Sequence, residues 1–222
     1  MNRKEKIIYK GKEYKADGLI FDVDGTIWDS TGVVTEAWNN ALADTGFDTR
    51  VTADRLKGLF GLPMIDIMRD ILPGVEEPRL RHFEEVCNEY EKNYILERSG
   101  EPYRHIAETI KALSEQMPVI IVSNCQAGYI ELMMDHLKLR EYVTDFVCPD
   151  YTGKLKADNI LLMAEKHGLK YPVYIGDTQM DADACKKADV PIIFCRYGFG
   201  TVEEPDAVID KPEDLLKILG MK

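Results

Sequence analysis

Short apolar runs recur along the chain, and segments with helical spacing separate most of them. The runs lie at residues 18–21, 118–122, 146–148, 173–175 and 191–195. Apolar residues at helical spacing lie between most of these runs, at 106–113, 129–137, 158–166 and 181–187. A continuous apolar run is typical of a strand that is buried on both faces. The pattern therefore predicts an α/β fold in which helices cover both faces of a parallel sheet.

Residues 30–100 interrupt this alternation, because no strand pattern occurs there. Helical spacing recurs at 33–42, 53–59, 65–71 and 79–96, and the stops between these segments contain glycine or proline. Thr52 is a typical N-cap for the second of these helices. The chain is thus predicted to form an α/β core from residues 1–29 and 101–222, with residues 30–100 as a helical insertion. Residues 7–15, around Gly11, predict a small hairpin that leads into the first core strand.

Two carboxylates follow the first core strand directly. Asp22 and Asp24 are separated by one residue and precede Gly25. Like charges this close repel each other unless a positive charge lies nearby. A hard divalent cation prefers oxygen ligands and would remove that repulsion. The pair therefore predicts a metal-dependent site at the end of this strand.

Three further polar motifs lie at strand ends. Ser123 and Asn124 follow the run 118–122, and either Lys154 or Lys156 lies in the turn after 146–148. Asp177 follows the run 173–175 within the sequence Gly-Asp-Thr. Any one of these motifs is also compatible with an ordinary turn or helix cap. Ligands of open α/β sheets bind at the carboxyl ends of strands, so all four motifs together predict one functional site.

This set of motifs resembles the haloacid dehalogenase superfamily of aspartate-nucleophile phosphatases. The resemblance extends from about Gly18 to Leu219. Residues 174–178 and 196–200 are most similar to the phosphoglycolate phosphatase-like branch. The resemblance implies a Rossmann-like parallel core with an inserted, all-helical cap. It also implies a phosphoric monoester hydrolase that uses Mg²⁺ and acts on a small phosphorylated metabolite.

The resemblance assigns roles to the acidic residues. Asp22 would be the nucleophile that forms an aspartyl-phosphate. Asp24 would protonate the leaving oxygen, then take a proton from the attacking water. Asp22, the backbone carbonyl of Asp24 and Asp177 would hold Mg²⁺. Asp181 would lie one helical turn further on, within reach of a water in the metal's shell. Asp183 is expected to be a solvated surface residue.

The remaining site residues are expected to bind the phosphoryl group. Ser123 would hold a phosphoryl oxygen through its hydroxyl, with Asn124 beside it. Thr26 would either bind near the phosphate or stabilise its own loop. The family lysine neutralises the nucleophile and the phosphoryl group, and Lys156 fits its position at a helix start better than Lys154. The insertion's loop 58–63 either faces this site or only connects two helices, and Trp28 and Phe60 are read as core residues.

Composition excludes several classes of partner. The formal net charge is −11, which disfavours binding to a nucleic-acid backbone or an anionic membrane. No apolar run is long enough to span a bilayer, and residues 1–15 contain no apolar signal core. The five cysteines are odd in number and have no CxxC spacing. Free thiols in packing positions and a cytoplasmic location are therefore expected, while the oligomeric state is left open.

Several alternative functions share parts of this pattern. A dehalogenase lacks the second aspartate, so Asp24 disfavours that activity. A sugar-phosphate phosphomutase usually carries Glu-Asp at the last motif, where this chain has Gly176 and Asp177. An inorganic pyrophosphatase of the same branch remains open. A receiver-like phospho-acceptor module also uses a strand-end Asp and a Lys, but it is shorter and has no helical insertion.

Overall fold

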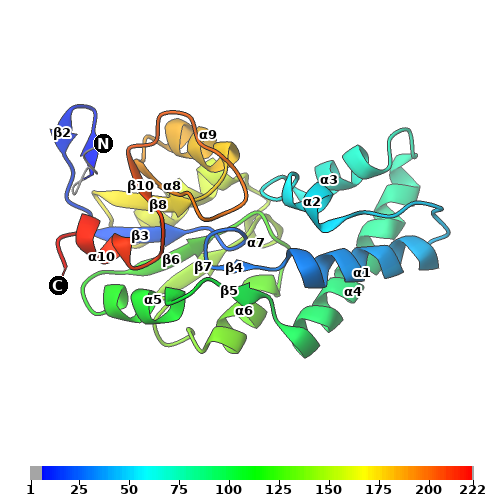
Figure 1. Cartoon of the computed structure of the whole chain (residues 1–222). Coiled ribbons are helices and arrows are strands. Elements are labelled where there is room, and N and C mark those ends of the chain that lie inside the picture. The colour runs from blue at the N-terminus through cyan, green and yellow to red at the C-terminus, as the bar shows by residue number, and fades with distance from the viewer. Residues whose placement is uncertain (1–6, 222) are drawn as a thin grey trace.

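A parallel sheet forms the centre of the computed structural model, which describes residues 7–221 (Figure 1). Within those residues the sheet has six strands in the order β10-β9-β8-β3-β6-β7, and all neighbouring pairs are parallel. The strands are β3 (Gly18–Phe21), β6 (Val119–Val122), β7 (Asp145–Val147), β8 (Pro172–Gly176), β9 (Ile192–Cys195) and β10 (Ala207–Ile209). This arrangement confirms the predicted α/β class and the Rossmann-like core.

The two faces of the sheet contribute to separate apolar clusters. Leu19 and Phe21 of β3 pack in one cluster, whereas Ile20 packs in the other. Helices α5 (Ile106–Ser114), α6 (Tyr129–Leu137) and α10 (Asp214–Ile218) contribute to the first cluster. Helices α8 (Lys156–Lys166) and α9 (Gln179–Ala188) contribute to the second. Because both faces are covered, positions in the central strands are apolar on both sides, which explains the continuous apolar runs.

Four helices form a separate layer beside the core (Figure 1). They are α1 (Thr31–Asp44), α2 (Ala53–Lys57), α3 (Met64–Ile71) and α4 (Glu77–Arg98). Helices α1 and α4 pack against each other, and the rings of Trp38 and Phe83 meet edge to face with centroids 5.7 Å apart. The Thr52 hydroxyl accepts a hydrogen bond from the backbone N–H of Arg55, so the expected N-cap is confirmed.

A short antiparallel pair links this helical layer to the core. Strand β4 (Trp28–Asp29) leads into α1, and β5 (Glu101–Pro102) follows α4. The chain therefore leaves and re-enters the core at adjacent points. The division into a core of residues 1–29 and 101–222 and an insertion of residues 30–100 stays a prediction.

The structure differs from the sequence prediction mainly in its shortest elements. The pattern did not predict β4, β5, β10 or the helices α7 (Pro149–Thr152) and α10. Each spans five residues or fewer, too short for a period to emerge. Helix α8 begins at Lys156, two residues before the predicted start. The hairpin is confirmed as β1 (Ile8–Tyr9) paired with β2 (Lys12–Glu13).

Candidate active site

Three of the predicted polar motifs meet at the middle of the sheet. Strand β3 lies between β6 and β8, so the chain order reverses at its carboxyl end. Such a switch point opens a crevice in which ligands bind. Asp22 follows β3, Ser123 follows β6 and Asp177 follows β8, and all three side chains are buried. The topology therefore brings together residues that are far apart in the sequence.

The carboxylate of Asp22 has one paired and one unpaired oxygen. Its Oδ2 lies 3.1 Å from Nζ of Lys156, while Oδ1 is buried without a hydrogen-bond partner among residues 7–221. Burial raises the pKa of Asp22 to about 6, although Lys156 and the Ser123 hydroxyl oppose the shift. A buried carboxylate oxygen without a partner is costly, so this atom is well suited to meet a ligand.

Lys156 is the first residue of α8 and lies in the interior. Its Nζ lies 2.7 Å from Oδ1 of Asp181 and 3.1 Å from Oδ2 of Asp22. Burial acts to lower the pKa of Lys156, but these two carboxylates outweigh burial and raise it. Lys154 is exposed. The choice between these two lysines as the catalytic residue stays a prediction, although only Lys156 lies at the aspartates.

Asp181 is saturated with hydrogen-bond donors. Its Oδ1 accepts from Lys156 and, at 3.3 Å, from the Tyr174 hydroxyl. Its Oδ2 accepts from the Thr178 hydroxyl at 2.8 Å and from the backbone N–H groups of Thr178 and Asp177. Burial alone would raise the pKa of Asp181, yet Lys156 and these donors lower it. Asp181 therefore fixes Lys156 and caps α9 at the same time.

Asp22, Asp177 and Asp181 form a buried group of carboxylates that fits a divalent cation. One oxygen from each lies within 4.8 Å of the others. Burial raises the pKa of Asp177 well above its usual range, and the carboxylates of Asp181 and Asp22 raise it further. One lysine does not balance three carboxylates, so a hard cation would complete the charge. Because Asp181 is saturated, Asp22 and Asp177 are the side chains with lone pairs to offer.

Asp24 is not one of the carboxylates of this group among the described residues. Its Oδ1 accepts hydrogen bonds from the hydroxyls of Ser30 at 2.5 Å and Tyr129 at 2.7 Å, and from the Trp28 indole N–H at 3.1 Å. Burial raises the pKa of Asp24, and these three donors oppose the shift. Three donors on one oxygen fix the orientation of the carboxyl group and leave Oδ2 for other chemistry.

The structure places the other predicted phosphate-binding residues in different surroundings. The Asn124 side-chain amide donates to the Gly61 carbonyl at 2.7 Å, so it links the core to the loop 58–63. The Thr26 hydroxyl donates to Oδ1 of Asp177 at 3.4 Å. Asn124 therefore contacts the helical insertion, and Thr26 contacts an acidic residue of the site.

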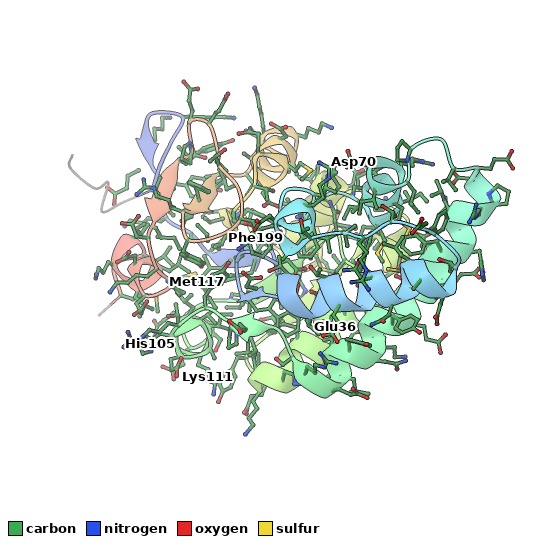
Figure 2. The ribbon with its side chains drawn as sticks, turned by 45° about the vertical axis from the view of Figure 1, so that its right-hand side comes forward. Glu36, Asp70, His105, Lys111, Met117 and Phe199 are labelled. Carbon is green, nitrogen blue, oxygen red and sulfur yellow. The ribbon has the colours of Figure 1, made fainter. Side chains whose placement is uncertain are left out.

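A pocket lies between these aspartates and the helical layer. Core residues Asp22, Asp24 and Ser123 line one side, and Phe60 and Gly61 line the other. Phe60 packs against Phe199 with ring centroids 5.6 Å apart, where the loop after β9 meets the helical layer near α2 (Figure 2). The loop 58–63 thus faces the site, and Phe60 is part of the pocket wall.

Comparison with known proteins identifies the family. The family model described as haloacid dehalogenase-like hydrolase matches residues 19–195, which is most of the chain and includes all four strand-end motifs. The chain belongs to the haloacid dehalogenase-like hydrolase family. This assignment confirms the family resemblance and the expectation of a hydrolase.

Two relatives of this hydrolase with curated names are phosphoglycolate phosphatases. The protein from Escherichia coli O157:H7 is 25% identical over 92% of this chain and 92% of its own length. The protein from Agrobacterium fabrum is 30% identical, over 86% of this chain and 87% of its own length. These similarities confirm the phosphoglycolate phosphatase-like resemblance and the expectation of a phosphatase.

Solved structures share the fold of this haloacid dehalogenase-like hydrolase. A haloacid dehalogenase-like family protein from Streptococcus pneumoniae has a TM-score of 0.79 at 20% identity, covering 90% of this chain and 96% of that one. A "predicted phosphoglycolate phosphatase" from Haemophilus somnus has a TM-score of 0.82 at 19% identity, covering 91% and 97%. In residues 7–221, no helix has the length and apolar character needed to cross a bilayer.

Several residues that support the site of this hydrolase were not predicted from the sequence as site residues. Tyr129 and Ser30 hold Asp24, and Tyr174 and Thr178 hold Asp181. Thr178 carried a usable signal, because a Thr three residues before an acidic residue is typical of a capping box. Ser30 and Tyr174 lie six and seven positions from their aspartates, without a recognised motif, and Tyr129 lies 105 positions from Asp24.

The glycine at position 25 fits closely against Asp177 and yields a testable prediction. Gly25 has φ +79°, and a Cβ there would lie 2.0 Å from Oδ2 of Asp177. Gly74 also has φ +79°, but a Cβ there would meet nothing within 4 Å. Both alanine substitutions cost about 1–2 kcal/mol of backbone strain. Gly25→Ala must also displace Asp177, so we expect it to lower the free energy of unfolding by about 2 kcal/mol more than Gly74→Ala.

Urea denaturation of both variants measures this difference. Gly25→Ala should also lose most of its turnover because it moves Asp177, whereas Gly74→Ala should retain it. Equal stability and equal activity of the two variants would contradict the close approach of Gly25 to Asp177.

Proposed function

We propose that this hydrolase is a Mg²⁺-dependent phosphatase that hydrolyses a small phosphomonoester through an aspartyl-phosphate on Asp22. One observation carries the proposal: Asp22 is held by Lys156 through Oδ2, while its buried Oδ1 is unpartnered within the described residues and the side chain lines the pocket. A carboxylate in this arrangement is oriented for attack on phosphorus.

In the first step, the Asp22 carboxylate attacks the phosphorus atom and the bond from phosphorus to the leaving oxygen breaks. Asp24 gives its proton to that oxygen, so the alcohol departs uncharged. In the second step, water attacks the phosphorus of the aspartyl-phosphate, the bond from phosphorus to the Asp22 oxygen breaks, and Asp24 takes a proton from the water. Inorganic phosphate leaves, and both aspartates return to their starting states.

The surroundings of Asp24 support its role as a proton carrier. A general acid must hold a proton near neutral pH, and burial raises the pKa of Asp24 in that direction. Ser30, Tyr129 and Trp28 all donate to Oδ1, so Oδ2 is the oxygen that carries the proton. The carboxyl group is also held in one orientation through both steps.

The charges around Asp22 support the remaining assignments. Asp22 and Asp177, with the backbone carbonyl of Asp24, would hold Mg²⁺. When bound, this cation would offset the repulsion between the nucleophile and the phosphoryl oxygens. Lys156 would neutralise negative charge on Asp22 and on the phosphoryl group. Ser123 would hold a phosphoryl oxygen. Asn124 and Thr26 complete the proposed phosphate-binding set, and Asp181 fixes Lys156 from behind.

The cellular setting and the role of residues 30–100 belong to the same proposal. These residues would act as a cap that closes over the pocket and excludes water during phosphoryl transfer. The five cysteines are unpaired in the described part of the chain, which supports a reducing, cytoplasmic compartment. The substrate would be a small phosphorylated metabolite.

Removal of divalent cations tests the metal dependence of this function. The purified protein is treated with EDTA and desalted, and turnover of p-nitrophenyl phosphate is measured before and after Mg²⁺ is added. We expect about a hundredfold or greater loss of turnover and its recovery with Mg²⁺. A circular dichroism spectrum of the chelated protein controls for unfolding. Undiminished turnover without a divalent cation would contradict the proposal.

A further inference from the structure

A buried glutamate lies in the pocket wall that faces the catalytic aspartates. Glu91 belongs to α4 of the helical layer and is 4% exposed. Its Oε1 accepts a hydrogen bond from the Trp38 indole N–H, and its Oε2 accepts one from the Gln126 side-chain amide. Both donors hold Glu91 as an acceptor, and both also line the pocket. No step of the proposed reaction uses this side chain.

The charged side chains that line this pocket are all acidic in the described part of the chain. Asp22, Asp24 and Glu91 line it, and among residues 7–221 no lysine, arginine or histidine is in the lining. Lys156 lies behind Asp22 and is already shared by two carboxylates. Lys57 of α2, which lies over the Phe199 ring, pairs with Asp29 at 3.1 Å. The part of the pocket beyond the phosphoryl site therefore offers no counter-charge to an anion.

The rest of the wall contributed by the helical layer is apolar. It is formed by Val34, Trp38, Phe60, Leu62, Met64 and Ile67. An anionic group that entered this space would lose its water and face the charge of Glu91 without compensation. A hydroxyl group would instead donate to one of the remaining lone pairs of Glu91, since each carboxylate oxygen accepts more than one hydrogen bond.

We propose that Glu91 is a specificity-determining residue that selects phosphomonoesters with an uncharged, hydroxyl-bearing leaving group and rejects those with a carboxylate. This inference rests on the proposed phosphatase function and narrows its substrate class. The named relatives are phosphoglycolate phosphatases, whose named substrate carries a carboxylate. The pocket of this chain accordingly predicts a different preference at the same catalytic centre.

A matched pair of substrates tests the inference. 2-Hydroxyethyl phosphate and 2-phosphoglycolate both have two carbons after the ester oxygen. The second carbon is a CH2 that bears a hydroxyl in the first compound and is the carboxylate carbon in the second. Assays are run at pH 8 with Mg²⁺, because burial raises the pKa of Glu91 to about 7 and the group is then ionised. We expect kcat/KM to be about tenfold or more higher for the hydroxyethyl ester.

Two variants on the same helix assign the preference to one residue. Glu91→Gln removes the negative charge, so kcat/KM for 2-phosphoglycolate should rise and the ratio between the substrates should fall about tenfold. Glu85→Gln is the matched control, because Glu85 is an exposed glutamate of α4. It should leave both values unchanged. Thermal melting of each variant verifies that it is folded, and the wild-type ratio alone already tests the preference.

The outcomes separate this inference from the function on which it rests. Turnover of p-nitrophenyl phosphate together with a preference for 2-phosphoglycolate would overturn the inference and leave the phosphatase proposal standing. A preference for 2-hydroxyethyl phosphate that Glu91→Gln does not change would overturn the role of Glu91. Absence of turnover with every phosphomonoester, p-nitrophenyl phosphate included, would overturn both.

Discussion

Asp22→Asn is expected to lower kcat for p-nitrophenyl phosphate by about 10³-fold or more, because an amide oxygen does not replace a carboxylate as the nucleophile. The substitution keeps the shape of the side chain. Lys156 retains its hydrogen bond to Asp181, so the buried cation keeps one partner. The variant should therefore remain folded.

Stability provides the control for this loss of activity. Burial raises the pKa of Asp22, so its ionised form is disfavoured in the folded protein. Removal of that charge should leave the melting temperature, measured without divalent cations, unchanged or higher. An active Asp22→Asn protein would exclude Asp22 as the nucleophile, whereas an inactive protein that melts far below the wild type would make unfolding the cause.

Lys156→Ala is expected to abolish most turnover and to lower the free energy of unfolding by about 3–5 kcal/mol. Lys156 is 4% exposed and lies against the carboxylates of Asp22 and Asp181. Its removal leaves buried carboxylates without their positive partner, and the pKa of Asp181 should lose much of its downward shift. Activity with saturating Mg²⁺ and urea denaturation measure the two effects separately.

Lys154→Ala is the matched control for this prediction. Lys154 lies two residues earlier and is exposed, and its backbone N–H, which the substitution keeps, donates to the Thr152 hydroxyl. The change in stability should stay within about 0.5 kcal/mol, with turnover near the wild-type value. A larger loss of activity from Lys154→Ala than from Lys156→Ala would show that the lysine has been assigned to the wrong position.

The central sheet could be predicted from sequence because each of its inner strands is a run of adjacent apolar residues. Strands 18–21, 118–122 and 173–175 are recognised by their apolar runs. Asp22 and Ser123 directly follow the first two, and Asp177 follows the third after Gly176. The rule that ligands bind at carboxyl strand ends then links the three motifs without any knowledge of strand order. The order in the sheet, with β3 between β6 and β8, adds the reason why they meet.

The surroundings of each catalytic group could not be predicted in this way. Tyr129 lies 105 positions from Asp24, and Gln126 lies 35 positions from Glu91. These contacts depend on how α4 and α6 approach the core, and no periodic pattern encodes that approach. Glu91 illustrates the limit, since a glutamate in a long polar helix reads as a surface residue until the fold buries it.

Asn124 illustrates a second limit. Its place directly after Ser123 predicted a phosphate contact, which stays a prediction, and the structure adds that its amide donates to the carbonyl of Gly61. The interaction depends on the docking of loop 58–63 on the core. The sequence did not decide whether this loop faces the site or only connects two helices. Residues at the boundary between the two layers therefore need the structure before a role can be proposed.

Chemical trapping of the covalent intermediate tests the central claim most directly. The enzyme is mixed with Mg²⁺ and a phosphomonoester it turns over, quenched, and treated with borohydride, which reduces an acyl phosphate but not a free carboxylate. Peptide mass spectrometry then locates the reduced residue. The account predicts homoserine at position 22 that appears only when substrate is present. Rapid turnover with no reduction at position 22, or with reduction at another aspartate, would contradict it.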